Sequence, residues 1–445
     1  MADLRQNDHI ETNISISLTQ RWLLLLVVCM LVAYRQPTIL TEPRFWAEEG
    51  TYFFSYAFSH SWFDTIFHVV PLFGFYSLTH NMAGLTATFV PLEYAPLVTV
   101  YLGFMSHLLP CVVVIFGNSP FWNKLSQRLL LCLGILLFPF GRMWLNTTYI
   151  HFTLALTVFL ILLSETKDSQ PLSKQFYRLL ILLGGLSGAV SCFLTPAFLL
   201  KAWKSRSKED IIHATVLTAT SLVQVSVFVY TLTQLDPNAR ARFTSFGYSN
   251  VWSIISFQFG IPFYGWPFTN LEFVTYLNNK FFYGIVLKYN IYFKNIILLL
   301  EKPVELFFCI IVIGYVSTIG VSQFRDPRLR LLPISFLLLF FLSTAGSVHM
   351  RGGPRYTYVP LVIILLMLLT EYHVNWENVT RRYLAALCIL IMLVVNGYAY
   401  RKGTETYWPK WLSECSTWRL DNSYALKIWP YNMSEQWKIS LDIKK

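Results

Sequence analysis

Long apolar segments are the feature that most constrains the fold of this chain. Several of them reach the roughly 18 to 20 residues that a helix needs to cross a lipid bilayer. Of the 445 residues, 55% are hydrophobic and only 13% are charged. A soluble domain with this composition would expose one continuous apolar surface to water. The sequence therefore predicts an all-α polytopic membrane protein.

The basic residues indicate how the chain is threaded through the membrane. The net charge is +11, but the lysines and arginines form short clusters between apolar segments, as in cytoplasmic loops. This distribution argues against nucleic acid as a partner and leaves membrane lipids as the expected surroundings. With residues 1–20 as a cytoplasmic N-terminal segment, the basic loops predict about nine to eleven transmembrane helices within residues 21–400. Residues 401–445 then form a short tail on the outer side.

Two regions do not fit simple crossings. The first outer loop, residues 41–80, contains an aromatic stretch that is broken by Asp64, His68 and Pro71, which favours interfacial or re-entrant helices. The segment Leu179–Leu200 has basic clusters at both ends, so we expect a hairpin of short helices that turns near Gly188–Pro196. Backbone broken at membrane depth is tolerated where protein or a water-filled cavity surrounds it. A second large outer loop is expected at residues 233–302.

The cysteines and histidines give no metal site. Six of the seven cysteines lie within apolar segments, where cysteine behaves as a small hydrophobic residue. No spacing of histidines and carboxylates is typical of a dedicated metal site. The sequence therefore implies no particular cofactor, although a bound divalent cation is compatible with it.

The predicted topology gathers the unusual polar residues on the outer face. These residues follow the first span, join the third span to the fourth, or lie between two late spans. In chain order they are Arg44, Trp46, Glu48, Glu49, Asp64, His68, Arg142, Asn146, His151, His349, Arg351, Arg355 and Tyr356. Because the threading used only the inner basic residues, this convergence is independent support for a pocket at the outer interface.

Glu48 and Glu49 have two interpretations. Adjacent carboxylates repel each other, which raises the pKa of one of them and suits a general base. Alternatively, both complement the dipole at the start of an interfacial helix. The nearby Arg44 and Trp46 favour the functional interpretation.

Arg355 follows two glycines and a proline at the start of a late span. Its planar guanidinium can bind a phosphate through paired hydrogen bonds, or it can reach toward lipid headgroups with no substrate involved. Asn146 fits a glycosylation acceptor pattern but is also placed to line the pocket. For His151 and His349, local hydrogen bonding is the simpler role.

Two motifs resemble a known family. Phe45-Trp46-Ala47-Glu48-Glu49-Gly50 after the first span and Pro354-Arg355-Tyr356-Thr357-Tyr358-Val359-Pro360 at a late span are similar to motifs of the GT-C membrane glycosyltransferases. The resemblance implies a GT-C-like helical fold in a bacterial inner membrane. It also implies a polyprenyl-phosphate sugar donor and a glycan, lipid or protein acceptor on the outer face. Glu48 or Glu49 would be the catalytic base, and Arg355 would contact the donor phosphate. One departure is the Glu-Glu pair, where an aspartate is more usual.

The rival class is a transporter or a lipid-linked-sugar flippase. Polar residues within the membrane and a broken hairpin would also suit alternating access. Against this class, the sequence has no repeated halves, and its polar residues gather at one surface instead of the midplane. An accessory subunit of an envelope assembly complex is a third possibility.

Overall fold

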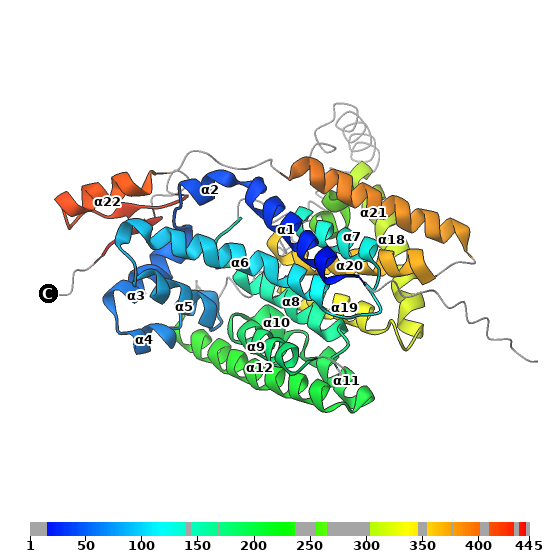
Figure 1. The fold of residues 1–445 in the computed structure, drawn as a ribbon. Coiled ribbons are helices and arrows are strands. Elements are labelled where there is room, and N and C mark those ends of the chain that lie inside the picture. Colours follow the sequence, from blue (N-terminus) through cyan, green and yellow to red (C-terminus); the bar gives the residue numbers. More distant parts are fainter. Residues whose placement is uncertain are drawn as a thin grey trace, which may run out of the picture.

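The computed structural model describes residues 16–138, 144–166, 170–235, 255–264, 303–345, 354–374, 378–400, 409–430 and 436–441. These residues form helices and one small sheet, in which η denotes short 3-10 or π helices (Figure 1). In chain order the elements are α1 (Leu18–Arg35), α2 (Pro37–Thr41), η1 (Glu49–Phe54), α3 (Ser55–Ser59), α4 (Trp62–Ile66), η2 (Pro71–Phe73), α5 (Leu78–Ala87), η3 (Leu92–Tyr94), α6 (Ala95–Phe116), α7 (Leu125–Leu137), η4 (Thr147–Tyr149), α8 (Ile150–Leu163), α9 (Pro171–Leu186), α10 (Ala189–Cys192), α11 (Thr195–Ser205), α12 (Lys208–Gln234), η5 (Ser256–Gly260), α18 (Pro303–Arg325), α19 (Leu331–Ala345), α20 (Pro354–Val374), α21 (Val379–Ala399), α22 (Trp411–Leu420), β1 (Leu426–Lys427) and β2 (Lys438–Ile439).

The prediction of an all-α polytopic membrane protein is confirmed. Six helices of the described residues are long and apolar enough to cross a membrane, and a bent pair brings the number to seven. The larger count of about nine to eleven crossings, taken from the positive-inside rule, would also require shorter apolar helices such as α7, α8 and α19. Most of residues 233–302 lies outside the described residues.

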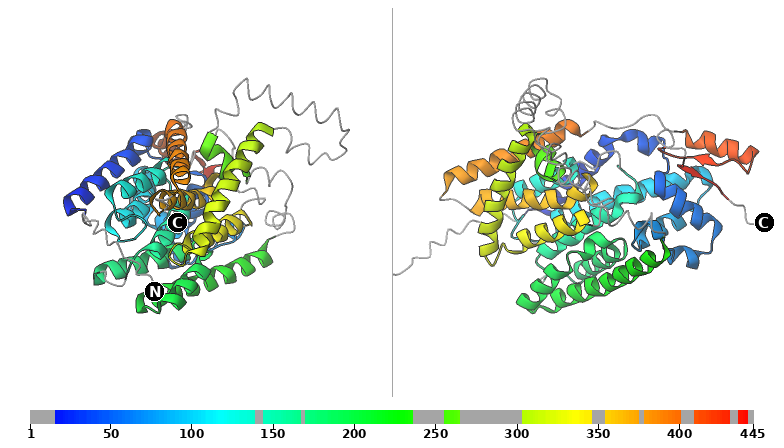
Figure 2. Two further views of the ribbon diagram at one scale, coloured as in Figure 1. Left: turned by 90° about the vertical axis from the view of Figure 1, so that its right-hand side faces the viewer. Right: turned by 180° about the vertical axis from the view of Figure 1, so that it is seen from behind.

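Helices at the periphery of the bundle expose apolar side chains, whereas helices at its centre are buried. Helices α1, α12, α18 and α21 expose large apolar side chains, including Leu26, Val225, Ile310 and Leu390, as expected for surfaces that face lipid. Helices α8 and α20 lie in the middle of the bundle (Figure 2). Every residue of α8 except His151 is buried, and so is most of α20. The core is therefore built around these two helices.

The basic loops meet at one end of the bundle. Arg178 pairs with Glu209 at 2.7 Å, and Lys201 pairs with Asp210 at 3.2 Å. Lys204 reaches the loop between α18 and α19, where its Nζ donates to the carbonyl of Pro327 at 2.9 Å. In Figure 1 this end, with α11, lies opposite α3, α4 and α22. The basic end of the bundle is therefore separate from the end that carries α3, α4 and α22.

Two segments of the structure do not form simple membrane crossings. Helices α9 and α10–α11 are bent by 114° at Gly188, which agrees with the predicted hairpin. Residues 51–75 fold as the short helices η1, α3, α4 and η2, none of which is long enough to span a bilayer. They pack against α5, which the sequence analysis did not predict.

Candidate functional site

The Phe45–Gly50 segment makes a sharp turn at Ala47. This residue is buried and has a φ of 23°, a conformation that residues other than glycine rarely adopt. Its N–H donates to the carbonyl of Trp429 at 2.6 Å. Such strain persists only where the surroundings hold it, and it is common at functional sites. The π helix η1 starts two residues later, and π turns are also frequent at such sites.

Glu49 is a structural carboxylate. It is only 2% exposed, and its Oε1 accepts hydrogen bonds from the N–H and the hydroxyl of Thr147 at 2.8 and 2.6 Å. Its Oε2 accepts from the N–H of Trp46 at 3.0 Å. Burial raises the pKa of Glu49 above its usual value, against the effect of these hydrogen bonds. Glu49 therefore fastens the start of η1 to the start of α8.

A second strained residue precedes α8. Leu145 has a φ of 55°. Gly103 of α6 packs directly against it, and a Cβ added to Gly103 would lie only 2.7 Å from the carbonyl carbon of Leu145. The next residue, Asn146, is 4% exposed, and its amide atoms have no hydrogen-bond partner within the described part of the chain. Asn146 is therefore a buried residue next to Thr147, which binds Glu49.

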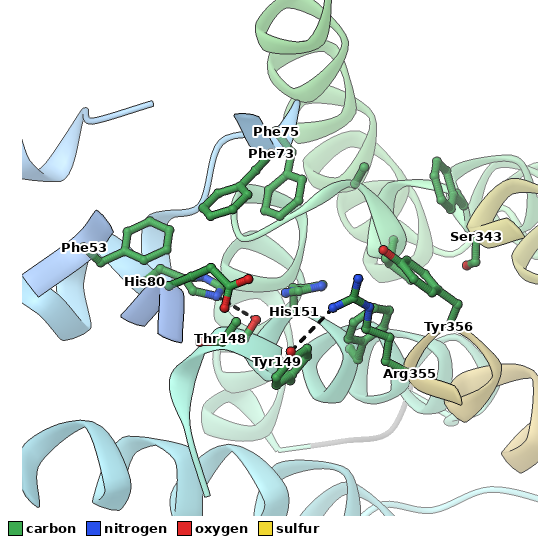
Figure 3. Close-up of a pocket in the computed structure, with 15 residues that line it drawn as sticks. Phe53, Phe73, Phe75, His80, Thr148, Tyr149, His151, Ser343, Arg355 and Tyr356 are labelled. Atoms are coloured by element: carbon green, nitrogen blue, oxygen red, sulfur yellow. Dashed lines mark hydrogen bonds between the residues drawn. The ribbon is translucent and has the colours of Figure 1, made fainter. Parts of the chain in front are cut away.

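A cavity of about 120 Å³, measured as space for the centres of water molecules, lies beyond Glu48. This volume is several times what one water requires. Figure 3 shows its wall, in which aromatic rings surround a few polar side chains. The lining residues are Glu48, Phe53, Phe73, Phe75, His80, Thr148, Tyr149, His151, Phe152, Ala189, Val190, Phe193, Ser343, Arg355 and Tyr356.

Arg355 is the cationic side chain of this wall. Its Nη1 lies 3.5 Å from the hydroxyl of Tyr149 (Figure 3). Its guanidinium also lies over the rings of Tyr356 and Tyr149, at 4.9 and 5.9 Å from the centroids. Glu48 lines the same cavity. A carboxylate and a guanidinium more than 300 residues apart in the sequence thus face one cavity.

Two histidines form another part of the wall. His80 of α5 bonds to Ser77 through Nδ1 and to the carbonyl of Thr148 through Nε2, the latter at 3.0 Å. Burial lowers the pKa of His80 to about 4, so its ring is neutral at neutral pH. Its ring centroid lies 5.8 Å from that of His151. Gly188, with a φ of 142°, lets the bend between α9 and α10 approach His151, where an added Cβ would lie 3.0 Å away.

The structure separates the predicted site residues into groups. Glu48, His151, Arg355 and Tyr356 line the cavity, whereas Glu49 and Asn146 are buried and are not among the lining residues. Arg44 and Trp46 are also buried but face Trp429 of the C-terminal segment. His349, Arg351 and Arg142 lie outside the described residues.

Asp64 is not part of the cavity. It is exposed and bonds to the hydroxyl of Ser61 at 2.7 Å, at the start of α4. Its neighbour His68 stacks on Tyr56, with ring centroids 3.6 Å apart. The expectation that Asp64 binds substrate is therefore unsupported by its position, because the fold of α4 turns it toward solvent.

Several wall residues had no sequence signal. His80 belongs to a short helix of mixed composition, and neither Thr148 nor Tyr149 was predicted as a site residue. Among the residues that the structure describes, no three histidine, cysteine or acidic side chains are grouped so that they could hold a metal ion. Comparisons with protein-family models, curated proteins and solved structures find no match to this chain.

Proposed function

We propose that the cavity is the active site of a glycosyltransferase in a bacterial inner membrane. The enzyme would move a sugar from a polyprenyl-phosphate donor to a glycan, lipid or protein acceptor on the outer face. The observation that carries the proposal is the placement of Glu48 and Arg355 on one aromatic cavity. A base for an acceptor hydroxyl and a cation for a departing phosphate are the two charges that such a transfer requires.

The phosphate side of the cavity has further support. Arg355 is the second residue of α20, and His151 is the second residue of α8. The positive ends of two helix dipoles are therefore near the cavity, and helix N-termini favour anions. The Tyr149 and Tyr356 rings hold the guanidinium in place, so that it is ordered before the phosphate arrives.

The cavity wall also contains residues whose hydroxyl groups could bind a sugar. Thr148 and Ser343 line the cavity, and their buried hydroxyls have no hydrogen-bond partner among the described residues. Buried polar groups are usually satisfied, so a ligand rich in hydroxyls would complete them. The surrounding phenylalanines and tyrosines offer flat surfaces for a sugar ring and for the first units of a polyprenyl chain.

The proposed reaction is a single displacement. Glu48 takes the proton of the acceptor hydroxyl as that oxygen forms a bond to the anomeric carbon. The bond from the anomeric carbon to the phosphate oxygen breaks at the same time, and its electron pair leaves with the lipid phosphate. Arg355 stabilises the charge that develops on this phosphate. The anomeric centre is inverted.

The test uses the full-length protein in proteoliposomes with a panel of polyprenyl-phosphate hexoses and pentoses. Glu48→Gln keeps the shape of the side chain but cannot take the proton, so transfer should fall by about 10² to 10⁴-fold. Asp64→Asn, an exposed carboxylate of the same outer region, is the matched control and should keep full activity. Full transfer by Glu48→Gln would refute the base assignment. Movement of the intact donor across the bilayer without bond cleavage would instead indicate a flippase.

A further inference from the structure

The C-terminal segment forms a small core with the residues around Glu48. The antiparallel strand pair β1–β2 lies beside η1, and α22 packs against β1 and η3 (Figures 1 and 2). Phe45 stacks on Phe54 at 4.5 Å and meets Trp411 edge-to-face at 5.2 Å. An added Cβ on Gly50 would lie 2.8 Å from the side chains of Ile428 and Ile439. The segment is thus a structural part of the outer face.

Trp429 makes the contacts nearest to the site. Its ring stacks on Trp46 with centroids 4.2 Å apart, and the guanidinium of Arg44 lies 5.4 Å from its centroid. Its carbonyl accepts the N–H of Ala47 at 2.6 Å. Trp429 is 2% exposed, and its indole N–H has no hydrogen-bond partner among the described residues. The side chain therefore acts through packing alone.

These contacts surround the strained residue that immediately precedes Glu48. Ala47 needs an external hold to keep a φ of 23°. Its own N–H is held by Trp429, and the ring of its neighbour Trp46 is covered by the same residue. If this hold were lost, Ala47 would relax toward a common conformation and rotate the backbone that carries Glu48.

We propose that Trp429 is a positioning residue, which holds Ala47 in its left-handed conformation and so directs Glu48 into the cavity. This inference rests on the proposed function, because the value of the placement is the proton transfer by Glu48. Misplacement of a reacting group by about 1 Å can cost about 10²-fold in rate. The C-terminal segment, although distant in sequence, would then set the turnover of the enzyme.

The test compares Trp429→Ala with Trp429→Phe in the full-length protein. Phenylalanine keeps the stack on Trp46 and loses no hydrogen bond, so it should restore most of the turnover. Trp429→Ala should lower kcat per folded molecule by about 10- to 100-fold and leave the KM for the polyprenyl-phosphate sugar within about threefold, since Arg355 is unchanged. Leu420→Ala, at an exposed position at the end of α22, is the control and should match wild type.

Hydrogen exchange of the Ala47 amide gives a second measurement that needs no activity. This amide should exchange at least about tenfold faster in Trp429→Ala than in wild type, because its acceptor is no longer held by the stack. If the alanine variant does not fold, Trp429→Leu takes its place in both measurements.

The outcomes separate the two proposals. Absence of sugar transfer by the wild-type protein would refute the proposed function, while the exchange of Ala47 would still report on the hold by Trp429. Normal kcat and normal Ala47 exchange in folded Trp429→Ala would overturn the positioning role even in an active enzyme. Equal losses in the alanine and phenylalanine variants would also overturn it.

Discussion

Replacing Glu49 with glutamine should destabilise the fold far more than the same change at Glu48. The Glu49 carboxylate accepts three hydrogen bonds, two from Thr147 and one from the N–H of Trp46. Glutamine has a single acceptor oxygen. If that oxygen keeps both bonds from Thr147, the new NH₂ group points at the Trp46 N–H, and two donors meet in a buried place.

The size of this effect follows from the hydrogen bonds lost. A hydrogen bond to a charged group contributes about 1.5 to 3 kcal/mol, and a buried donor without a partner costs about 1 to 3 kcal/mol. Glu49→Gln loses one such hydrogen bond and leaves one buried donor, the N–H of Trp46, without a partner. The two costs describe the same broken bond in part, so they do not add fully. We therefore expect the free energy of unfolding to fall by about 2 to 4 kcal/mol. Glu48 is only partly buried at the cavity wall, so Glu48→Gln should change it by less than about 1 kcal/mol.

Thermal unfolding of the purified variants in detergent, followed by tryptophan fluorescence, measures this difference. The pH dependence provides an internal check. Burial raises the pKa of Glu49 above its ordinary value of 4.5, so the folded state binds this proton more tightly than the unfolded state. The stabilisation that comes from this bound proton is fully present at a pH below the pKa of Glu49 in the unfolded state. It is lost as the pH rises through the pKa of Glu49 in the folded state. Glu49→Gln should remove this dependence. Unchanged melting of Glu49→Gln, or an equal loss in Glu48→Gln, would refute the structural role.

Two further substitutions test the cavity. Arg355→Lys keeps the charge but loses the planar donor pair, so transfer should fall by about tenfold or more, measured as kcat with the polyprenyl-phosphate sugar panel; wild-type kcat would contradict the phosphate role. Ala47→Gly removes the cost of the left-handed conformation, about 1 to 2 kcal/mol, but frees the backbone before Glu48. The Ala47→Gly variant should therefore have an equal or higher melting temperature and a lower kcat. A rise in both the melting temperature and kcat would contradict the proposal that the strained turn at Ala47 positions Glu48.

The long helices were predictable because their signal is local. Helix α6, for example, is a largely apolar segment of 22 residues without a charged side chain, so its composition alone predicts a membrane span. The hairpin at Leu179–Leu200 was predictable from charge, because basic clusters at both ends require an even number of passes. Its cavity-facing bend at Gly188 agrees with that reasoning.

Helix α5 and the C-terminal core were not predictable in the same way. Residues Leu78–Ala87 have mixed composition, and α5 depends on contacts with distant segments, such as the approach of Gly84 to the carbonyl oxygen of Phe53, which an added Cβ would meet at 2.8 Å. The strands β1 and β2 have two residues each, which leaves no periodic pattern. Tryptophans close to a membrane span are typical of the membrane–water interface, but Trp411 and Trp429 are buried in protein contacts.

The difference between Glu48 and Glu49 also depends on long-range contacts. Both are glutamates in the loop that follows the first span, so composition and spacing cannot distinguish them. Thr147, 98 residues later in the chain, binds one of them, and the strained turn at Ala47 leaves the other at the cavity. Sequence reasoning could therefore find the pair, but the contacts that distinguish its two members come from distant parts of the chain.

The same contacts bear on the choice between a transferase and a transporter. An alternating-access transporter needs a site near the midplane whose two sides move relative to each other. Here the cavity lies at the N-terminal ends of α8 and α20. Its carboxylate segment is fastened twice, by Glu49 to Thr147 and by Ala47 to Trp429. Such support maintains the backbone strain at Ala47, and in the proposed transferase it would keep Glu48 at a fixed place relative to Arg355. Fixed geometry lowers the barrier of a bond-forming step, whereas it would hinder a site that has to open alternately to both sides. The two contacts that hold the segment of Glu48 therefore favour the proposed sugar transfer over the rival proposal of a transporter.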